Sequence, residues 1–225
     1  MDDMRETIGK IVSIEWEMFI AVNEGEERAS CQEDRDTFTG MREAQYKAWT
    51  PVAVGAYLAD LEDARKNGRN LVEEKYIHMM KTTEPARYES LLSRVTPPSD
   101  ASRALAKDIS DKLLDQTRVL FEDYPYVSGR GRPLYSELDY GNISVETYQL
   151  SELLTYSERT LEALKEHVLA LEKDGKSLAR IILENTVRFY GYDSLETAET
   201  ATRERADELE IEVSFGCSDC EDCDL

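Results

Sequence analysis

The end of the chain holds the cysteine pattern with the clearest chemical meaning. Cys217, Cys220 and Cys223 are separated by two residues each, and this C-x-x-C-x-x-C spacing lets three thiolates converge on one metal ion or iron–sulfur cluster. A four-coordinate site needs one more ligand, which Cys31 could supply if the tail folds back onto the body of the protein. The four cysteines therefore predict a thiolate site for zinc or an iron–sulfur cluster.

Other interpretations of these cysteines compete with the metal site. The tail could act as a flexible thiol relay, or it could be an inert acidic extension. Cys31 lies just before a predicted helix, whose N-terminal partial positive charge favours an ionised and nucleophilic thiol, although Glu33 and Asp34 act in the opposite direction. Cys31 is therefore a candidate catalytic nucleophile, and a small buried structural cysteine is the alternative.

A carboxylate interrupts the apolar face of the first predicted helix. Glu15 lies four residues after Ile11 and three before Met18, so it shares their side of the helix. A buried carboxylate must be paired or protonated, because desolvation of the bare charge costs several kcal/mol. The next helix offers partners, since Arg42 and Gln45 stand between the apolar residues of its own stripe.

A later helix adds three polar residues to this set, namely Glu74, Lys75 and Tyr76. One interpretation is a buried salt-bridge network that fixes the register of the helices. The other is a pocket for an anionic or amide-bearing ligand, because perturbed buried charges often mark functional sites. In the pocket, Glu15, Arg42 and Gln45 would orient the ligand, and Tyr76 would be the candidate proton donor.

The elements that position these residues are helices. Helical periodicity dominates the chain, and no run of alternating β-branched residues bounded by turns indicates a strand. We predict an all-α fold, a single-domain multi-helix bundle over residues 1–215 with an acidic, cysteine-rich tail over residues 216–225. The predicted helices span residues 5–22, 32 or 36 to 49, 51–66, 71–82, 85–95, 101–123, 178–190 and a last stretch that ends near 209.

Ser144 is predicted to cap the longest helix of the chain. Apolar residues recur along it at spacings of four and three, at Leu150, Leu154, Leu161, Leu164, Val168 and Leu171, with Ser157 in the same row. This row favours a seam in the core of a bundle, and a coiled-coil dimer is the alternative. Residues 124–142 precede the helix as a long irregular loop, and loops of that length are often functional.

The composition of the 225 residues limits location and partners. Acidic residues outnumber basic ones 47 to 27, and the formal charge of -20 repels nucleic acids and anionic membranes. The N-terminus MDDMRETIGK lacks a basic segment, and charges break the apolar runs, so neither a signal peptide nor a membrane span is predicted. We expect a cytoplasmic protein whose partner is a small molecule, a metal ion or another protein, and not nucleic acid or membrane.

Five blocks of the sequence resemble a prokaryotic family described as a domain of unknown function, DUF4125. The blocks are VNEGEERASCQEDRDTFTGMREAQYKAW, GRNLVEEKYIHMMKTTEPARY, GRPLYSELD, SVETYQLSELLTYSERTL and VRFYGYDSLETAE. The family pattern corresponds here to a mostly polar set, Asn23, Arg28, Cys31, Gln32, Asp34, Arg42, Gln45, Glu74, Lys75, Tyr76, Glu152 and Tyr156. This set is too polar to be explained by packing alone, and we take its members as candidate site residues; the resemblance itself implies no particular activity.

These observations favour a small-molecule or metal-dependent enzyme. Its internal polar site is expected from the first, second and fourth helices, and its metal from the tail cysteines. A non-enzymatic interaction module is one alternative, in which the polar residues form a structural network and the acidic surface meets a basic partner. The other alternative is a thiol redox or metal-carrier protein that acts through the tail alone.

Overall fold

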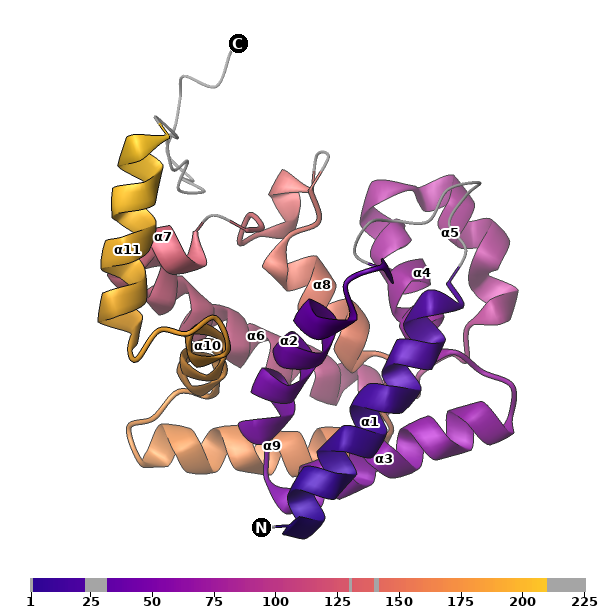
Figure 1. Ribbon diagram of the computed structural model, residues 1–225. Coiled ribbons are helices and arrows are strands. Elements are labelled where there is room, and N and C mark those ends of the chain that lie inside the picture. The colour runs from indigo at the N-terminus through magenta and orange to yellow at the C-terminus, as the bar shows by residue number, and fades with distance from the viewer. Residues whose placement is uncertain (1, 23–31, 130, 140–141, 210–225) are drawn as a thin grey trace.

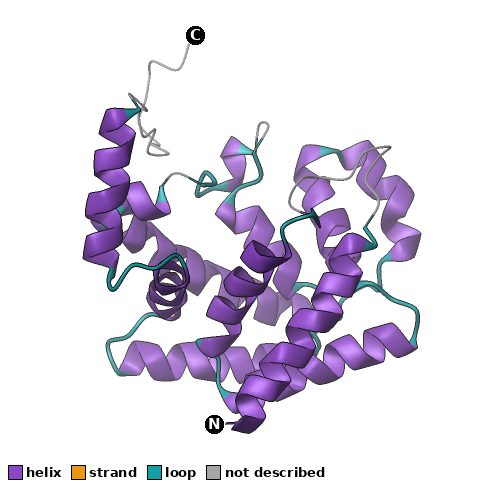
Figure 2. Ribbon diagram, viewed as in Figure 1, coloured by secondary structure: helices purple, strands orange, loops and turns teal. Residues whose placement is uncertain are grey.

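The computed structural model describes residues 2–22, 32–129, 131–139 and 142–209, and in these residues every regular element is a helix (Figures 1 and 2). The predicted all-α class is therefore confirmed. The cysteine-rich tail at 216–225 lies outside the described residues, so the boundary at residue 215 stays a prediction. None of the described helices is long and apolar enough to cross a membrane.

The helices follow one another closely along the chain. They are α1 Asp2–Ile20, α2 Arg35–Lys47, α3 Pro51–Lys66, α4 Leu71–Thr83, α5 Pro85–Leu91, α6 Asp100–Asp123, α7 Pro125–Ser128, α8 Val145–Leu153, α9 Glu158–Lys173, α10 Leu178–Phe189 and α11 Leu195–Glu208, with single 3-10 turns at Leu92–Arg94 and Ser136–Leu138. Side chains that accept a hydrogen bond from the first helical turn start eight of them, namely Asp34, Thr50, Asn70, Ser99, Ser144, Ser157, Ser177 and Ser194. Such caps satisfy backbone N–H groups that the helix itself leaves unpaired.

Helices α1, α2, α3, α4, α6, α8, α9 and α10 enclose one apolar core. Helices α1 and α2 lie side by side, α3 and α9 pack across their lower ends, and α4 packs against α8 (Figure 1). Helix α6 contacts α8, α9 and α10, and α10 closes against α2. Ile11, Leu61, Ile109 and Leu161 are among the fully buried members of this core.

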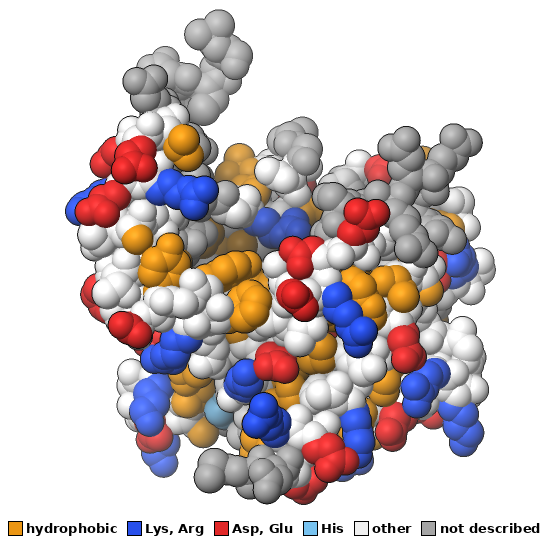
Figure 3. Space-filling view, viewed as in Figure 1, with side chains coloured by type: hydrophobic (Ala, Val, Ile, Leu, Met, Phe, Trp, Pro, Cys, Tyr) orange, Lys and Arg blue, Asp and Glu red, His pale blue; other side chains and the backbone are white. Residues whose placement is uncertain are grey.

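The surface does not separate its charges by sign on the face shown in Figure 3. Acidic and basic side chains alternate there among small hydrophobic patches. Many of the basic residues are paired within one helix, as Lys10 is with Glu6 and Lys47 with Glu43. The excess acidic charge is therefore spread over this face and does not gather into one patch.

The prediction of one long helix after Ser144 was wrong, because the chain turns between α8 and α9. Ser157 starts α9 as its cap, and its own backbone N–H donates to Asp60 Oδ2 in α3 at 2.9 Å. The hydroxyl of Thr160 donates to the same oxygen at 2.7 Å. Asp60 thus accepts from the Ser157 backbone N–H, which in a continuous helix would donate to a carbonyl of the preceding turn, and this favours a break in the helix at Ser157. The longest described helix is instead α6, with 24 residues.

The predicted irregular loop before Ser144 contains two short helical pieces. These are α7 Pro125–Ser128 and the 3-10 turn Ser136–Leu138. Asp139 ties the loop to α8, because its carboxylate accepts from the backbone of Ser144 and from the hydroxyl of Thr147, each at 2.7 Å. The loop is thus fixed to the start of the helix that carries Glu152.

Asp60→Ala is expected to lower the free energy of unfolding by about 2 kcal/mol, since it removes two hydrogen bonds to a charged acceptor from the start of α9. Urea unfolding of both proteins measures the difference. Asp63→Ala, at an exposed position of the same helix, is the matched control and should change stability by less than about 0.5 kcal/mol. Equal losses in the two variants would contradict the role given to Asp60.

Candidate functional site

Glu15 lies in the middle of α1 with 2% of its surface exposed, and four donors surround its carboxylate. Oε1 accepts hydrogen bonds from the hydroxyls of Tyr46 and Tyr57, each at 2.7 Å, and from Nη2 of Arg42. Oε2 accepts from Nε of Arg42 at 2.9 Å. The carboxylate in the apolar stripe is therefore paired with the guanidinium of the neighbouring helix, as the spacing of the two residues predicts.

Arg42 joins Glu15 to a second buried carboxylate, Glu152 of α8. Its Nη1 donates to Gln45 Oε1 at 3.0 Å and to both oxygens of Glu152 at 3.2 Å, and its Nη2 also donates to the hydroxyl of Tyr46. A guanidinium has five N–H donors. The protein supplies an acceptor for each of them, so Arg42 has no donor left over for a ligand.

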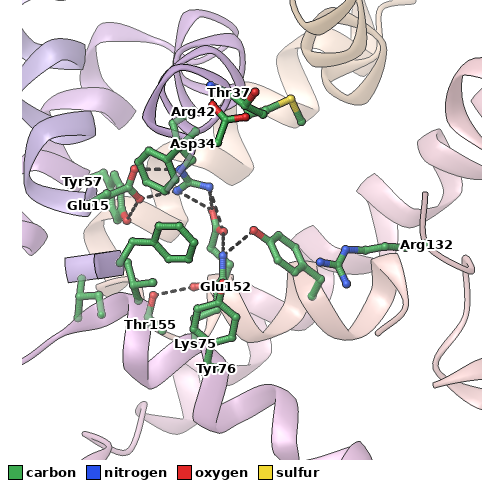
Figure 4. A pocket seen from close by; sticks show the side chains of 16 residues that line it. Glu15, Asp34, Thr37, Arg42, Tyr57, Lys75, Tyr76, Arg132, Glu152 and Thr155 are labelled. Carbon is green, nitrogen blue, oxygen red and sulfur yellow. Dashed lines mark hydrogen bonds and ion pairs between the residues drawn. The ribbon is translucent and has the colours of Figure 1, made fainter. Parts of the chain in front are cut away.

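Lys75 of α4 completes the network on the other side of Glu152. Its Nζ donates to Glu152 Oε2 at 3.0 Å and to the hydroxyl of Tyr148 at 2.7 Å. Gln45 and Tyr156 donate to Glu152 Oε1 at 2.9 Å and 2.7 Å. Two carboxylates and two cations thus alternate in the order Glu15, Arg42, Glu152, Lys75, and this chain of dashed contacts is visible in Figure 4.

Glu152 and Lys75 keep their charges at neutral pH. Burial alone would raise the pKa of the Glu152 carboxyl, but the charges of Arg42 and Lys75 hold it well below its usual range. Burial alone would lower the pKa of Lys75, but Tyr148 and Glu152 raise it above its usual value. Burial raises the pKa of three tyrosine hydroxyls, those of Tyr46, Tyr57 and Tyr156, well above normal, so they stay protonated donors.

A cavity of about 330 Å³ lies between α1, α2, α4 and α8, and the network forms one of its walls (Figure 4). Phe19, Phe38, Leu71 and Val72 contribute apolar surface to the rest of the lining. Enclosed, largely apolar cavities with a few convergent polar groups are the usual form of small-molecule sites. The cavity is therefore the place where the polar network can meet a ligand.

Unsatisfied donors gather at one end of this cavity. Among the described residues, Lys75 has oxygen acceptors for two of its three N–H groups, and Tyr148 accepts from Lys75 while its own O–H stays available. The Arg132 guanidinium lies 4.6 Å from the centre of the Tyr148 ring, and Lys75 Nζ lies 4.0 Å from it. An ammonium and a hydroxyl with unused N–H and O–H groups thus lie near a guanidinium whose Nη1 donates to the carbonyl of Ile143 at 3.0 Å, and this grouping suits an anionic oxygen ligand.

The structure brings together half of the site residues inferred from the sequence. Glu15, Arg42, Gln45, Lys75, Glu152 and Tyr156 form the network. Tyr76 and Asp34 line the cavity, and the Asp34 carboxylate also caps α2 by accepting from the backbone of Thr37 at 3.0 Å. Arg28, Cys31, Cys217, Cys220 and Cys223 lie outside the described residues.

Two of the inferred residues are placed away from the cavity. Gln32 donates from its amide to the carbonyls of Phe19 and Val22 at 2.8 and 3.0 Å, so it satisfies the end of α1. Glu74 accepts two hydrogen bonds from Arg69, each at 2.8 Å, on the other side of α4 from Lys75. Both polar residues are thus explained by local structure.

Other residues of the site were missed because they read as ordinary packing residues. They are Tyr46, Tyr57, Tyr148 and Thr155. The sequence did contain one signal for Tyr46: it follows Arg42 by four residues, so the two side chains lie on the same face of a helix. In the part of the chain that the structure describes, no group of three or more His, Cys, Asp or Glu is arranged to hold a metal ion.

Arg42→Ala is expected to lower the free energy of unfolding by about 3–5 kcal/mol. The variant leaves Glu15 buried without a paired cation and leaves Glu152 paired with Lys75 alone. Arg65→Ala is the control, since Arg65 forms an exposed pair with Glu17 at 3.9 Å and should cost less than about 1 kcal/mol. Chemical denaturation measures both. Unchanged stability of the Arg42 variant would contradict the structural role given to the network.

Comparison with known proteins gives a family and no activity. The model of the family described as "Protein of unknown function (DUF4125)" matches residues 5–200. This range contains all of the network from Glu15 to Tyr156 and both sides of the cavity. Comparison with curated proteins and with solved structures finds no match. On the extent of the family match, this chain belongs to the DUF4125 family.

Proposed function

We propose that the protein binds a small organic carboxylate in the cavity between α1, α2, α4 and α8. The observation that carries the proposal is the convergence of Lys75, Tyr148 and Arg132 at one end of this cavity. Lys75 Nζ and the Tyr148 hydroxyl lie 2.7 Å apart, and the Arg132 guanidinium lies against the Tyr148 ring. A carboxylate has two oxygens that accept several hydrogen bonds. The remaining apolar lining suits a ligand with a hydrocarbon body.

The charge balance of the network supports an anion at this end of the cavity. Arg42 and Lys75 together compensate Glu15 and Glu152, so the four buried groups carry no net charge. Arg132 is exposed and adds one further positive charge beside Tyr148. Asp34, the other charged residue of the lining outside the network, is also exposed and caps α2. A carboxylate bound beside Tyr148 would therefore face the charge of Arg132 together with directed donors, and the network would hold those donors in place.

The network residues act in this proposal by positioning. Arg42 has all of its donors in use, so it orients Glu15, Gln45 and Glu152 and leaves the contact with the ligand to Lys75. If the protein is an enzyme, Tyr76 in the cavity wall is the candidate proton donor. In a non-enzymatic module the same network would have a purely structural role. A measurement of ligand binding distinguishes the ligand-binding protein from the structural module.

Calorimetric titration of the full chain with 3-phenylpropionate and octanoate tests the proposal against the two matching amides. The carboxylates should bind at least ~10-fold more tightly than the amides, since each charge-assisted hydrogen bond contributes about 1.5–3 kcal/mol. Tyr148→Phe should lower carboxylate affinity by a similar factor, because it removes only the hydroxyl that faces the cavity.

Tyr124→Phe is the matched control, since it removes a hydroxyl that contacts Glu196, outside the network, and lines neither this cavity nor its neighbour. It should leave carboxylate affinity unchanged. Equal affinity for acids and amides, or no binding of any of the four compounds, would overturn the proposal and favour the structural module.

We propose, in addition, that Cys217, Cys220 and Cys223 bind zinc or an iron–sulfur cluster, with Cys31 as the fourth ligand. The C-x-x-C-x-x-C spacing supports this proposal, and all four residues lie outside the described part of the chain. The cytoplasm, the location predicted from the sequence, keeps cysteine thiols reduced and so available as metal ligands. Without a bound metal, the same tail would suit a thiol relay or a metal carrier.

Anaerobic purification with metal analysis, sulfide analysis and visible absorption tests the tail. The full chain should hold stoichiometric metal, and a variant that ends at Gly216 should hold none. Cys31→Ser should weaken retention of the metal if this residue completes the site. Absence of metal from the full chain would exclude the metal site and leave the relay as the function of the tail.

A further inference from the structure

A second cavity, of about 200 Å³, lies on the other side of Glu152 and Tyr148 from the first. Both residues line both cavities, so the last part of the polar network separates the two spaces. Helices α6, α9 and α10 provide the far wall through Ile109, Leu164 and Leu178, each at most 2% exposed. The second cavity is therefore formed by the core of the protein itself.

We infer that this second cavity binds a neutral, planar ring compound that carries one N–H or O–H donor, of the indole or phenol class. The size supports a ring ligand. A cavity of about 150 Å³ lined by aliphatic and aromatic side chains is large enough for benzene. A space of about 200 Å³ accommodates a ring of that size with a small addition.

The lining excludes a charged occupant from the interior of this cavity. Two charged residues line it, Glu152 and Arg132. Arg42 and Lys75 already compensate the charge of Glu152, and Arg132 is exposed to solvent and donates from Nη1 to the carbonyl of Ile143 at 3.0 Å. Val168 and Leu178 are almost fully buried on the opposite side. An ion placed among these apolar side chains would lose its hydration and find only the solvent-exposed charge of Arg132, and such desolvation costs several kcal/mol. A neutral ring loses little on entry and gains contact with apolar side chains.

Gln149 gives the ring a directional contact. Its Nε2 donates to the carbonyl of Ser110 at 2.9 Å and to the Ser110 hydroxyl at 3.2 Å, so the orientation of the amide is fixed. Within the described ranges of the chain, Oε1 of Gln149 has no hydrogen-bond donor, and Gln149 lines the cavity. A ligand N–H or O–H would supply the missing donor.

Indole and benzofuran test the inference, because they share size and shape while only indole has an N–H. Isothermal titration of the full chain should show indole binding ~10-fold more tightly than benzofuran, the ratio expected for one satisfied acceptor. Gln149→Met, which keeps the length of the side chain, should bring the two affinities together. Equal affinity of the two compounds for the unchanged protein would overturn the inference.

Filling the cavity provides the second measurement. Leu113→Trp places a large side chain in the cavity wall and should abolish binding of both compounds. Leu105→Trp is the matched control, at a partly buried position on the same helix that does not line the cavity, and should retain binding. Binding that survives Leu113→Trp in a folded variant would place the ring elsewhere and contradict the inference. Neither probe is a carboxylate, so this result does not depend on the function proposed for the first cavity.

Discussion

The pairing of Glu15 with Arg42 is the interaction on which the rest of the structure depends. A carboxylate at the centre of α1 can remain in the core only if a cation stays beside it, because removal of either partner leaves a desolvated charge. This requirement fixes α2 against α1. The tyrosine hydroxyls of α2 and α3 complete the shell of Glu15, so the position of α3 is tied to the same group.

The need to pair buried charges also fixes helices that are distant in sequence. Arg42 reaches Glu152, 110 residues away, and Glu152 in turn accepts from Lys75, 77 residues away. An apolar core of comparable volume would be equally compact, but it would tolerate small rotations of each helix. Hydrogen-bonded charges tolerate fewer, since each donor needs its acceptor at a defined distance and angle. We interpret the network as the device that sets the relative rotation of α1, α2, α4 and α8.

Much of this arrangement follows from the sequence and part of it does not. Glu15 and Arg42 stand out because helical spacing places them on apolar faces, and the serine and proline signals mark the ends of the helices. The turn at Ser157 was missed because its stabilising partner, Asp60, is 97 residues away and no local pattern records it. Gln32 and Glu74 were assigned to the site because polarity alone does not tell a ligand contact from a helix cap or a local ion pair. The tyrosines were overlooked for the opposite reason, since their rings read as core and their hydroxyls carry the polar role.

The thin partition between the two cavities has a further consequence. Tyr148 and Glu152 face both spaces, so a ligand that displaces the Tyr148 ring in one cavity changes the shape of the other. Two occupants would then be thermodynamically coupled, and the factor by which the first alters the affinity of the second would equal the factor in the reverse direction. The sign of that coupling would depend on which rotation of the ring each occupant favours. A wall shared by two compartments thus gives a small helical protein the physical means to sense two compounds at once.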